Sequence, residues 1–387
     1  MPFDCQYRVT HGPGACLVSC PTRVGPGGFL FARVERPGDL PPADPSLIDI
    51  ALLDMHHGWP NLGHDCLVHA VQNAVCDMRP LLARAGLSVR VLSYEVRQGH
   101  MIPEPPGGRH TIYLGTGGPG HLDPRRNDGV DPGSQGIVED PAWESPLFRL
   151  FDAILADHTA SLLAVCHTFG VMCRWLGIAD VRLRGPAKGG KSAGIVENML
   201  TGEAMIHPWF SRFAAELPAA PRFRVLDNRL YDLVPGRPLP AGVTAIAHET
   251  IGRGGPAGEA LTMIDVGRRS DVVPRVLGVN HHPEVVNRQR QLVVLRQKLA
   301  RGGVSPEWAE ERMRTLEQPI EDEFGDRLLY LTSSYTLLAP LRVHLYREAG
   351  RRAAAFGVPL LDGLDALPLT YSLVRDGFDP RMHLTAP

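Results

Sequence analysis

Cys166 is the residue whose position in this sequence most suggests nucleophilic chemistry. It follows the apolar run of residues 161–165 and precedes a helical pattern, so that a strand would lead through a sharp turn into a helix. At the N-terminus of a helix the dipole favours the thiolate, which is the nucleophilic form of cysteine. A buried cysteine at the end of a strand would show the same pattern, because cysteine is among the most buried residue types. The cysteine alone leaves both interpretations open.

A histidine and a carboxylate two residues apart could serve such a thiol. His282 and Glu284 follow the apolar run of residues 276–279, and their spacing places both side chains on the same side of an extended chain. A carboxylate so placed holds the imidazole and stabilises its protonated form, which completes a set of nucleophile, base and orienting group. The competing interpretation is a surface turn with the sequence His-Pro-Glu.

The elements that must position these groups alternate between strands and helices. Residues 47–53 are mostly apolar, as in a strand buried on both faces. Helical patterns cover residues 65–79, where Pro80 should stop or kink the helix, and residues 145–157. This alternation predicts an α/β three-layer sandwich with a mostly parallel sheet. The other strands are expected at residues 89–96, 111–114, 161–165, 223–226, 243–247, 261–266 and 276–279.

The two ends of the chain differ from this central part in composition and in expected secondary structure. Residues 1–45 are rich in glycine and proline, which resist regular structure, and are interpreted as an N-terminal arm. Residues 46–287 form the predicted domain, and residues 288–387 are expected to be a helical extension. Its helices are predicted at residues 288–301, from Ser305 onward, and at residues 326–356 with a kink at Pro340.

Three segments in this order resemble the class I glutamine amidotransferase family. The family pattern is a strand ending in S-G-G-P-G, a G-x-C-x-G-x-Q cysteine turn and a G-x-Q-x-H-P-E segment. Residues 111–120 end in Gly-Thr-Gly-Gly-Pro-Gly, the cysteine turn is at Cys166, and residues 278–284 read Gly-Val-Asn-His-His-Pro-Glu. The resemblance covers roughly residues 47–287 and implies a flavodoxin-like strand order.

The resemblance also implies a mechanism that needs no cofactor or metal. Cys166 would be the nucleophile, His282 the general base and then acid, and Glu284 the group that orients it. The side-chain amide of glutamine would be attacked, a thioester would form, ammonia would leave toward a separate synthetase subunit, and water would release glutamate. Further roles would fall to the backbone N–H groups of Gly118 and His167, as the oxyanion hole, and to Gly117 and Thr168, as substrate contacts.

The sequence departs from the family at four positions. Ala164, Thr168 and Gly170 stand where the family has Gly, Gly and Gln, and Asn280 replaces the Gln of the His-Pro-Glu segment. The family uses the first of these glutamines to hold its substrate. Another amide or ester substrate therefore stays open, as does a non-catalytic binding module on the same fold.

A phosphate-binding loop is a competing motif. The segment from Gly185 to Ser192 satisfies G-x-x-x-x-G-K-S, in which Lys191 and Ser192 would contact a nucleotide. That function requires a buried strand before the loop and a helix directly after it. The preceding residues 181–184 are half charged, and the resemblance instead makes this segment a surface loop.

Charge and composition exclude several classes of function. The chain has 40 basic and 42 acidic side chains, so it has no net positive charge that would attract nucleic acid or an anionic membrane. No apolar run approaches the roughly 18 residues of a membrane span, and no leader pattern is visible at the N-terminus, so we expect a cytoplasmic protein.

Other groups of possible ligands support only structural interpretations. The seven cysteines form no CxxC pair, which argues against a disulfide framework and a zinc knuckle. The cluster His56, His57, His64 and His69 lacks metal-ligand spacing and is expected to line the mouth of a pocket. The arginine-rich residues 288–314 also contain glutamates and are interpreted as solvated helix faces.

Overall fold

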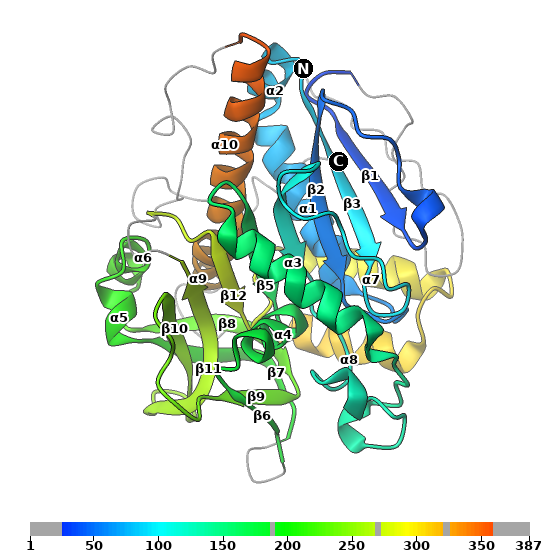
Figure 1. Ribbon diagram of the computed structural model, residues 1–387. Coiled ribbons are helices and arrows are strands. Elements are labelled where there is room, and N and C mark those ends of the chain that lie inside the picture. The colour runs from blue at the N-terminus through cyan, green and yellow to red at the C-terminus, as the bar shows by residue number, and fades with distance from the viewer. Residues whose placement is uncertain (1–24, 186–189, 268–271, 320–325, 359–387) are drawn as a thin grey trace.

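A ten-stranded sheet forms the centre of the molecule, with the strand order β1-β3-β2-β4-β5-β12-β11-β10-β7-β8 (Figure 1). The computed structural model describes residues 25–185, 190–267, 272–319 and 326–358. The first six strands in this order are parallel to one another, and the last four are joined antiparallel. The parallel strands are β1 (Phe29–Val34), β3 (Ser88–Glu95), β2 (Leu47–Asp54), β4 (His110–Gly115), β5 (Ser161–Val165) and β12 (Val276–Val279).

The antiparallel half extends the sheet beyond β12. Its strands are β11 (Ala257–Val266), β10 (Val243–Thr250), β7 (Ser192–Leu200) and β8 (Arg222–Arg229). A separate antiparallel pair, β6 (Asp180–Leu183) and β9 (Tyr231–Val234), forms a small second sheet. β9 and β11 lie in contact, so the small sheet stays attached to the main one.

Helices cover both faces of the parallel strands. Alternate residues of β2 serve the two faces: Ile50 packs in a core with α1 (Leu62–Asp77) and α10 (Ala339–Ala355), and Leu53 packs in a second core with α3 (Glu144–Ala156) and α4 (His167–Leu176). This arrangement is the predicted three-layer α/β sandwich. Without β1, the parallel strands follow the flavodoxin-like order 2-1-3-4-5, which confirms the expected fold class.

The start of α1 and its end follow from local sequence. The Asn61 side chain caps the first turn by accepting a hydrogen bond from the His64 backbone N–H at 2.7 Å, so the helix begins at Leu62, three residues before its predicted start. Pro80 ends it as predicted, and lies in the first turn of the short helix α2 (Arg79–Arg84), where proline is tolerated.

The expected N-terminal arm needs correction. β1 lies within residues 1–45 and pairs in parallel with β3 at the edge of the sheet. An edge strand needs hydrogen bonds on one side only, so the short run Phe-Leu-Phe-Ala-Arg-Val suffices despite the glycines and prolines around it. The domain therefore begins before residue 46. Residues 1–24 lie outside the described part.

The expected C-terminal extension is partly a component of the main core. α9 (Asp326–Ser333) continues through one π-helical turn (Ser334–Leu338) into α10, where Pro340 lies in the first turn. Tyr335, Leu341 and Leu345 are almost completely buried in the same core as α1. The break in the helix takes the form of the π-turn just before the proline, the kind of irregularity at which long helices bend.

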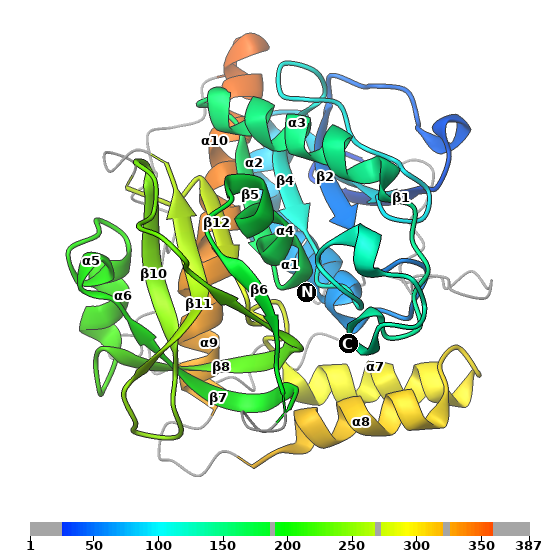
Figure 2. The same cartoon turned by 60° about the horizontal axis from the view of Figure 1, so that its bottom comes forward.

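The remaining helices lie at the edges of the sandwich. α7 (Arg288–Ala300) and α8 (Pro306–Glu317) form an antiparallel hairpin, and α8 also contacts β7 (Figure 2). Leu295, Ala309 and Leu316 of this hairpin form a third small core with Cys66 and Val285. α5 (Gly202–Met205) and α6 (Phe210–Glu216) connect β7 to β8. No helix among the described residues is long and apolar enough to span a membrane.

Candidate active site

Cys166 forms the sharp turn between β5 and α4. Its backbone dihedrals are φ 50° and ψ −101°, a conformation that is strained for any residue with a side chain. The backbone N–H of Cys166 donates to the Val279 carbonyl at 2.7 Å, which ties the turn to the neighbouring strand β12. The thiol is partly exposed and lies at the N-terminus of α4, as the sequence predicts.

His282 and Glu284 lie beside this turn because β12 pairs in parallel with β5. Nδ1 of His282 lies 2.8 Å from Oε1 of Glu284, and the Glu284 side chain has no exposed surface. A β-carbon on Gly117 would lie 3.0 Å from Cε1 of His282 and 3.7 Å from Sγ of Cys166. The imidazole and the thiol therefore both lie against Gly117. The structure thus brings Cys166, His282 and Glu284 together.

The surroundings of His282 favour its protonated form. Burial alone lowers the pKa of His282, but the negative charge of Glu284 and then that of the Cys166 thiolate raise it well above the ordinary value. A side-chain hydrogen bond to Cys166 acts in the same direction, and Nε2, the ring nitrogen that Glu284 does not engage, is buried.

The loop after β4 provides backbone donors next to the thiol. The backbone N–H groups of Gly118 and His167 have no acceptor within the described residues. A β-carbon on Gly118 would lie 2.2 Å from the Met55 carbonyl oxygen, so only glycine permits this close approach. The two donors come from separate segments, and their role as an oxyanion hole stays a prediction.

Thr168 has a different role from the expected substrate contact. Its side chain is fully buried, and its Oγ1 and backbone N–H both donate to the Thr116 carbonyl, at 2.7 and 3.2 Å. A β-carbon on Gly115 would lie 2.3 Å from Cγ2 of Thr168, so the space for this branched side chain comes from β4. Thr168 holds the loop before Gly118 rather than lining the cavity, and the expectation for Thr168 was wrong.

A buried ion pair supports the loop that contains Gly118. It was not predicted from the sequence. Arg97 and Glu139 have no exposed side-chain surface and form two hydrogen bonds of 2.5 and 2.7 Å. Nη1 of Arg97 also donates to the carbonyls of Met55, at 2.9 Å, and Pro119, at 2.7 Å. Arg97 therefore fixes Pro119, which follows Gly118, and Met55, whose carbonyl lies against Gly118. Nothing in the sequence connects Arg97 with Glu139, because the two lie on different loops.

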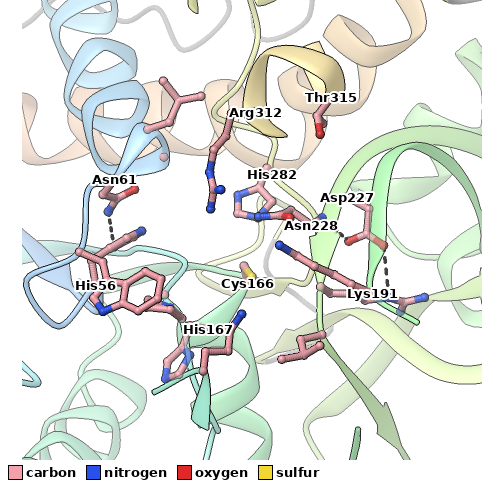
Figure 3. A pocket seen from close by; sticks show the side chains of 18 of the residues that line it. His56, Asn61, Cys166, His167, Lys191, Asp227, Asn228, His282, Arg312 and Thr315 are labelled. Atoms are coloured by element: carbon pink, nitrogen blue, oxygen red, sulfur yellow. Dashed lines mark hydrogen bonds and ion pairs between the residues drawn. The ribbon is translucent and has the colours of Figure 1, made fainter. Parts of the chain in front are cut away.

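The thiol opens into a cavity of about 170 Å³ (Figure 3). One side of this cavity comes from α8 and was not predicted: its residues Trp308, Glu311, Arg312, Thr315 and Leu316 are called the α8 wall below. The arginine-rich segment was interpreted as solvated, yet the Arg312 guanidinium lies 4.3 Å from the centre of the Trp308 ring. The i, i+4 spacing of Trp308 and Arg312 was the only available signal. Other lining residues include His56, Asn61, Cys166, His167, Lys191, Asp227, Asn228 and His282.

Comparison with known proteins identifies a likeness in solved structures only. No protein-family model and no curated protein matches the sequence. A glutamine amidotransferase from Thermotoga maritima is 15% identical, with 76% of this chain and 98% of that chain covered and a TM-score of 0.42. One from Methylobacillus flagellatus is 12% identical, with 76% and 94% covered and a TM-score of 0.40. A putative GMP synthase subunit from Thermoplasma acidophilum is 13% identical, with 62% and 85% covered and a TM-score of 0.35.

At these identities and TM-scores the likeness carries no conclusion about activity, and what the site can do follows from its own side chains.

The histidines after β2 divide between the cavity and the interior. His56 lines the cavity, and its Nδ1 lies 3.1 Å from Oγ1 of Thr116. Burial lowers the pKa of His56 to about 4, although Asp54 opposes this shift, so the ring is neutral at neutral pH. His64 is buried and pairs with Oγ of Ser93 at 2.8 Å, which places it away from the expected pocket mouth. The described residues contain no group of three or more side chains suited to a metal ion.

The phosphate-loop hypothesis was wrong. Strand β7 begins at Ser192, where a phosphate-binding loop requires a helix. Oγ of Ser192 donates to Asp227 at 2.6 Å, and Nζ of Lys191 pairs with Oε1 of Glu311 at 3.0 Å. Both side chains are thus committed to other contacts. Residues 186–189 of this motif lie outside the described part.

Proposed function

We propose that this chain is a cysteine-dependent amidohydrolase of the glutamine amidotransferase type, with Cys166 as nucleophile, His282 as acid and base, and Glu284 as orienting carboxylate. The observation that supports the proposal is the 2.8 Å pair of His282 and Glu284 beside a strained cysteine turn. Each of the three groups has a local reason for its position: a strand-to-helix turn, a neighbouring parallel strand and a fully buried carboxylate.

The reaction would begin from a thiolate beside an imidazolium. Sγ of Cys166 attacks the amide carbon, and the oxygen that becomes negative faces the backbone N–H groups of Gly118 and His167; such donors contribute about 3 kcal/mol each to transition-state stabilisation. Nε2 of His282 gives its proton to the nitrogen, which leaves as ammonia, and a thioester remains. His282 then takes a proton from water as the water attacks the thioester. The products are a carboxylic acid, ammonia and the free thiol.

Glutamine is the substrate that we propose to test first, and one contact bears on it. A β-carbon on Gly170 would lie 2.5 Å from Cδ1 of Leu122, so Leu122 fills the space beside the position at which the family carries glutamine. Leu122 also lines the cavity. The substrate would therefore meet an apolar side chain there in place of an amide. We further propose that the released ammonia serves a separate synthetase subunit.

Trapping with a glutamine-analogue chloroketone or diazoketone tests the nucleophile. Mass spectrometry should find the label on Cys166, no label in the Cys166→Ala variant and much slower labelling in the His282→Ala variant. Cys76 on α1 is exposed and serves as an internal comparison, because its labelling should not depend on His282.

Glutamate and ammonia release from glutamine would be measured alongside. If Cys166 resists both the analogue and iodoacetamide while Cys76 reacts, the cysteine turn is inert and the chain is a binding module on this fold.

A further inference from the structure

Apolar side chains from two of the hydrophobic cores line the cavity into which the thiol opens. Leu122 and Leu233 belong to the core that contains α3 and α4, and Leu226, Val285 and Leu316 belong to the small core of the α7–α8 hairpin. The exposed fractions of these five residues lie between 1% and 7%, so packing holds each of them in place. Two separate cores therefore contribute preformed apolar walls to one cavity.

These apolar walls lie next to the proposed catalytic groups. The backbone N–H of Gly170 donates to the Cys166 carbonyl at 3.0 Å, so Gly170 lies one helical turn after the thiol. Leu122 occupies the space beside Gly170. On the side of the base, the backbone N–H of His282 donates to the Leu226 carbonyl at 2.9 Å. A group held between the thiol and the imidazole would therefore have apolar side chains as neighbours.

The charged side chains that line the cavity are already engaged with one another or with nearby charges. Nδ1 of His282 lies 2.8 Å from its counterion Glu284. A charged substrate group would have to compete with these ion pairs, whereas an apolar group would leave them intact. The remaining pairs are those of Lys191 and Arg312 with Glu311, and of Arg229 with Asp227, Asp232 and Glu249.

The size of the cavity limits the group that can enter it. Its volume is about 170 Å³. An apolar cavity of roughly 150 Å³ in a protein holds one benzene molecule, so a chain of about four to six carbons is of the right size.

We propose that the acyl part of the substrate is a short apolar chain, held against Leu122 beside the thiol. The inference rests on the proposed function and names its substrate class: amides with apolar acyl groups, ahead of glutamine. The bond changes stay the same. A thioester forms at Cys166 as the C–N bond breaks, the nitrogen takes a proton from His282 and leaves as ammonia, and water then releases a carboxylic acid. The recognised group differs, because Leu122 provides a surface on which an apolar chain leaves water.

Two chloromethyl ketones with different chains test this inference. One carries the amino-acid end of glutamine and the other a plain butyl chain, so the reactive group is the same. Mass spectrometry gives the rate of each reagent at Cys166, divided by its rate at the exposed Cys76. In the full-length wild type we expect this normalised rate to be about tenfold or more higher for the butyl reagent, since each methylene that leaves water improves binding by about fourfold.

Substitutions of Leu122 show whether this residue sets the preference. In Leu122→Gln the preference for the butyl reagent should fall about tenfold, because an amide replaces the apolar surface. Leu122→Met keeps an apolar side chain of similar volume and should keep the preference. Leu183→Gln makes the same change on β6, at a side chain that is 45% exposed and does not line the cavity, and should leave the preference unchanged.

The possible outcomes separate this inference from the proposed function. A wild-type preference at or below one, or an equal preference in the wild type and Leu122→Gln, would overturn the inference and leave the proposed function intact. The wild-type preference decides the inference even if Leu122→Gln does not fold. Labelling of Cys166 by neither chloromethyl ketone nor iodoacetamide would overturn the proposed function, and the inference with it.

Discussion

A β-carbon on Gly63 would lie 2.6 Å from Oε1 of Glu284, the oxygen that pairs with His282. Gly63 lies in the first turn of α1, where the helix dipole is positive and stabilises a carboxylate. The absence of a side chain lets Glu284 approach the helix and the imidazole at the same time. This glycine therefore belongs to the support of the proposed catalytic histidine, although it touches no substrate.

Gly63→Ala should move the Glu284 carboxylate away from His282. We expect labelling of Cys166 by a glutamine-analogue diazoketone to slow by about tenfold to a hundredfold, the scale of losses caused by a misplacement of about 1 Å. The melting temperature should change little, because alanine is favoured over glycine in a helix by up to about 1 kcal/mol. Gly202→Ala is the matched control: Gly202 opens α5, and a β-carbon there meets nothing within 4 Å. Unchanged labelling in Gly63→Ala would contradict the role given to this contact.

Removing only one partner of the Arg97–Glu139 ion pair should destabilise the protein more than removing both. Arg97→Met leaves the Glu139 carboxylate buried without its cation, which we expect to lower the free energy of unfolding by about 3–5 kcal/mol. The double variant Arg97→Met/Glu139→Leu should lose less, because no unpaired charge remains. Urea unfolding of both variants measures the difference. Arg125→Gln should cost less than about 1 kcal/mol, because the Arg125 side chain is 55% exposed and its partner Glu144 keeps Arg174. A double variant that is less stable than the single one would refute this account of the pair.

Buried neutral histidines should destabilise the protein in mild acid. Burial is the main cause that lowers the pKa of His281 to about 3 and those of His110 and His344 to about 4. In the unfolded chain these rings titrate near a pKa of about 6.5, so the unfolded state binds more protons as the pH falls from there. The free energy of unfolding should therefore fall between about pH 6.5 and pH 4, by up to about 1.4 kcal/mol per pH unit for each ring.

Urea unfolding at a series of pH values measures that slope. In His344→Gln the amide can still donate to the Pro274 carbonyl, which His344 contacts at 2.8 Å, and the slope should decrease by about one proton. A slope that is the same in His344→Gln and the wild type would show that His344 does not contribute.

The sequence predicts the proposed catalytic groups better than their surroundings. β2 and β5 are apolar runs buried on both faces, and Cys166 follows directly from the end of β5. β1 was missed because an edge strand needs only a few apolar residues, which here lie among glycines and prolines. The role of Thr168 depends on the space left by Gly115 on another strand, and a single sequence carries no signal for such a contact.

The α8 wall was missed for a related reason. Charged residues on a helix face are usually solvated, and only the tertiary contact with β7 turns Arg312 toward the cavity. Residues that line a cavity from a distant segment are decided by packing, which local periodicity does not encode.

The pairing of β5 with β12 also sets a time order. Cys166 is synthesised before His282. The strand that His282 follows must insert between β5 and β11 after a long intervening segment has been made. Contacts between segments so distant in sequence form slowly. A growing or partly folded chain therefore carries the thiol without the proposed base, and the proposed reaction requires that β12 has paired with β5. The alkylation rate of Cys166, followed during refolding, would therefore report when β12 pairs with β5 and β11.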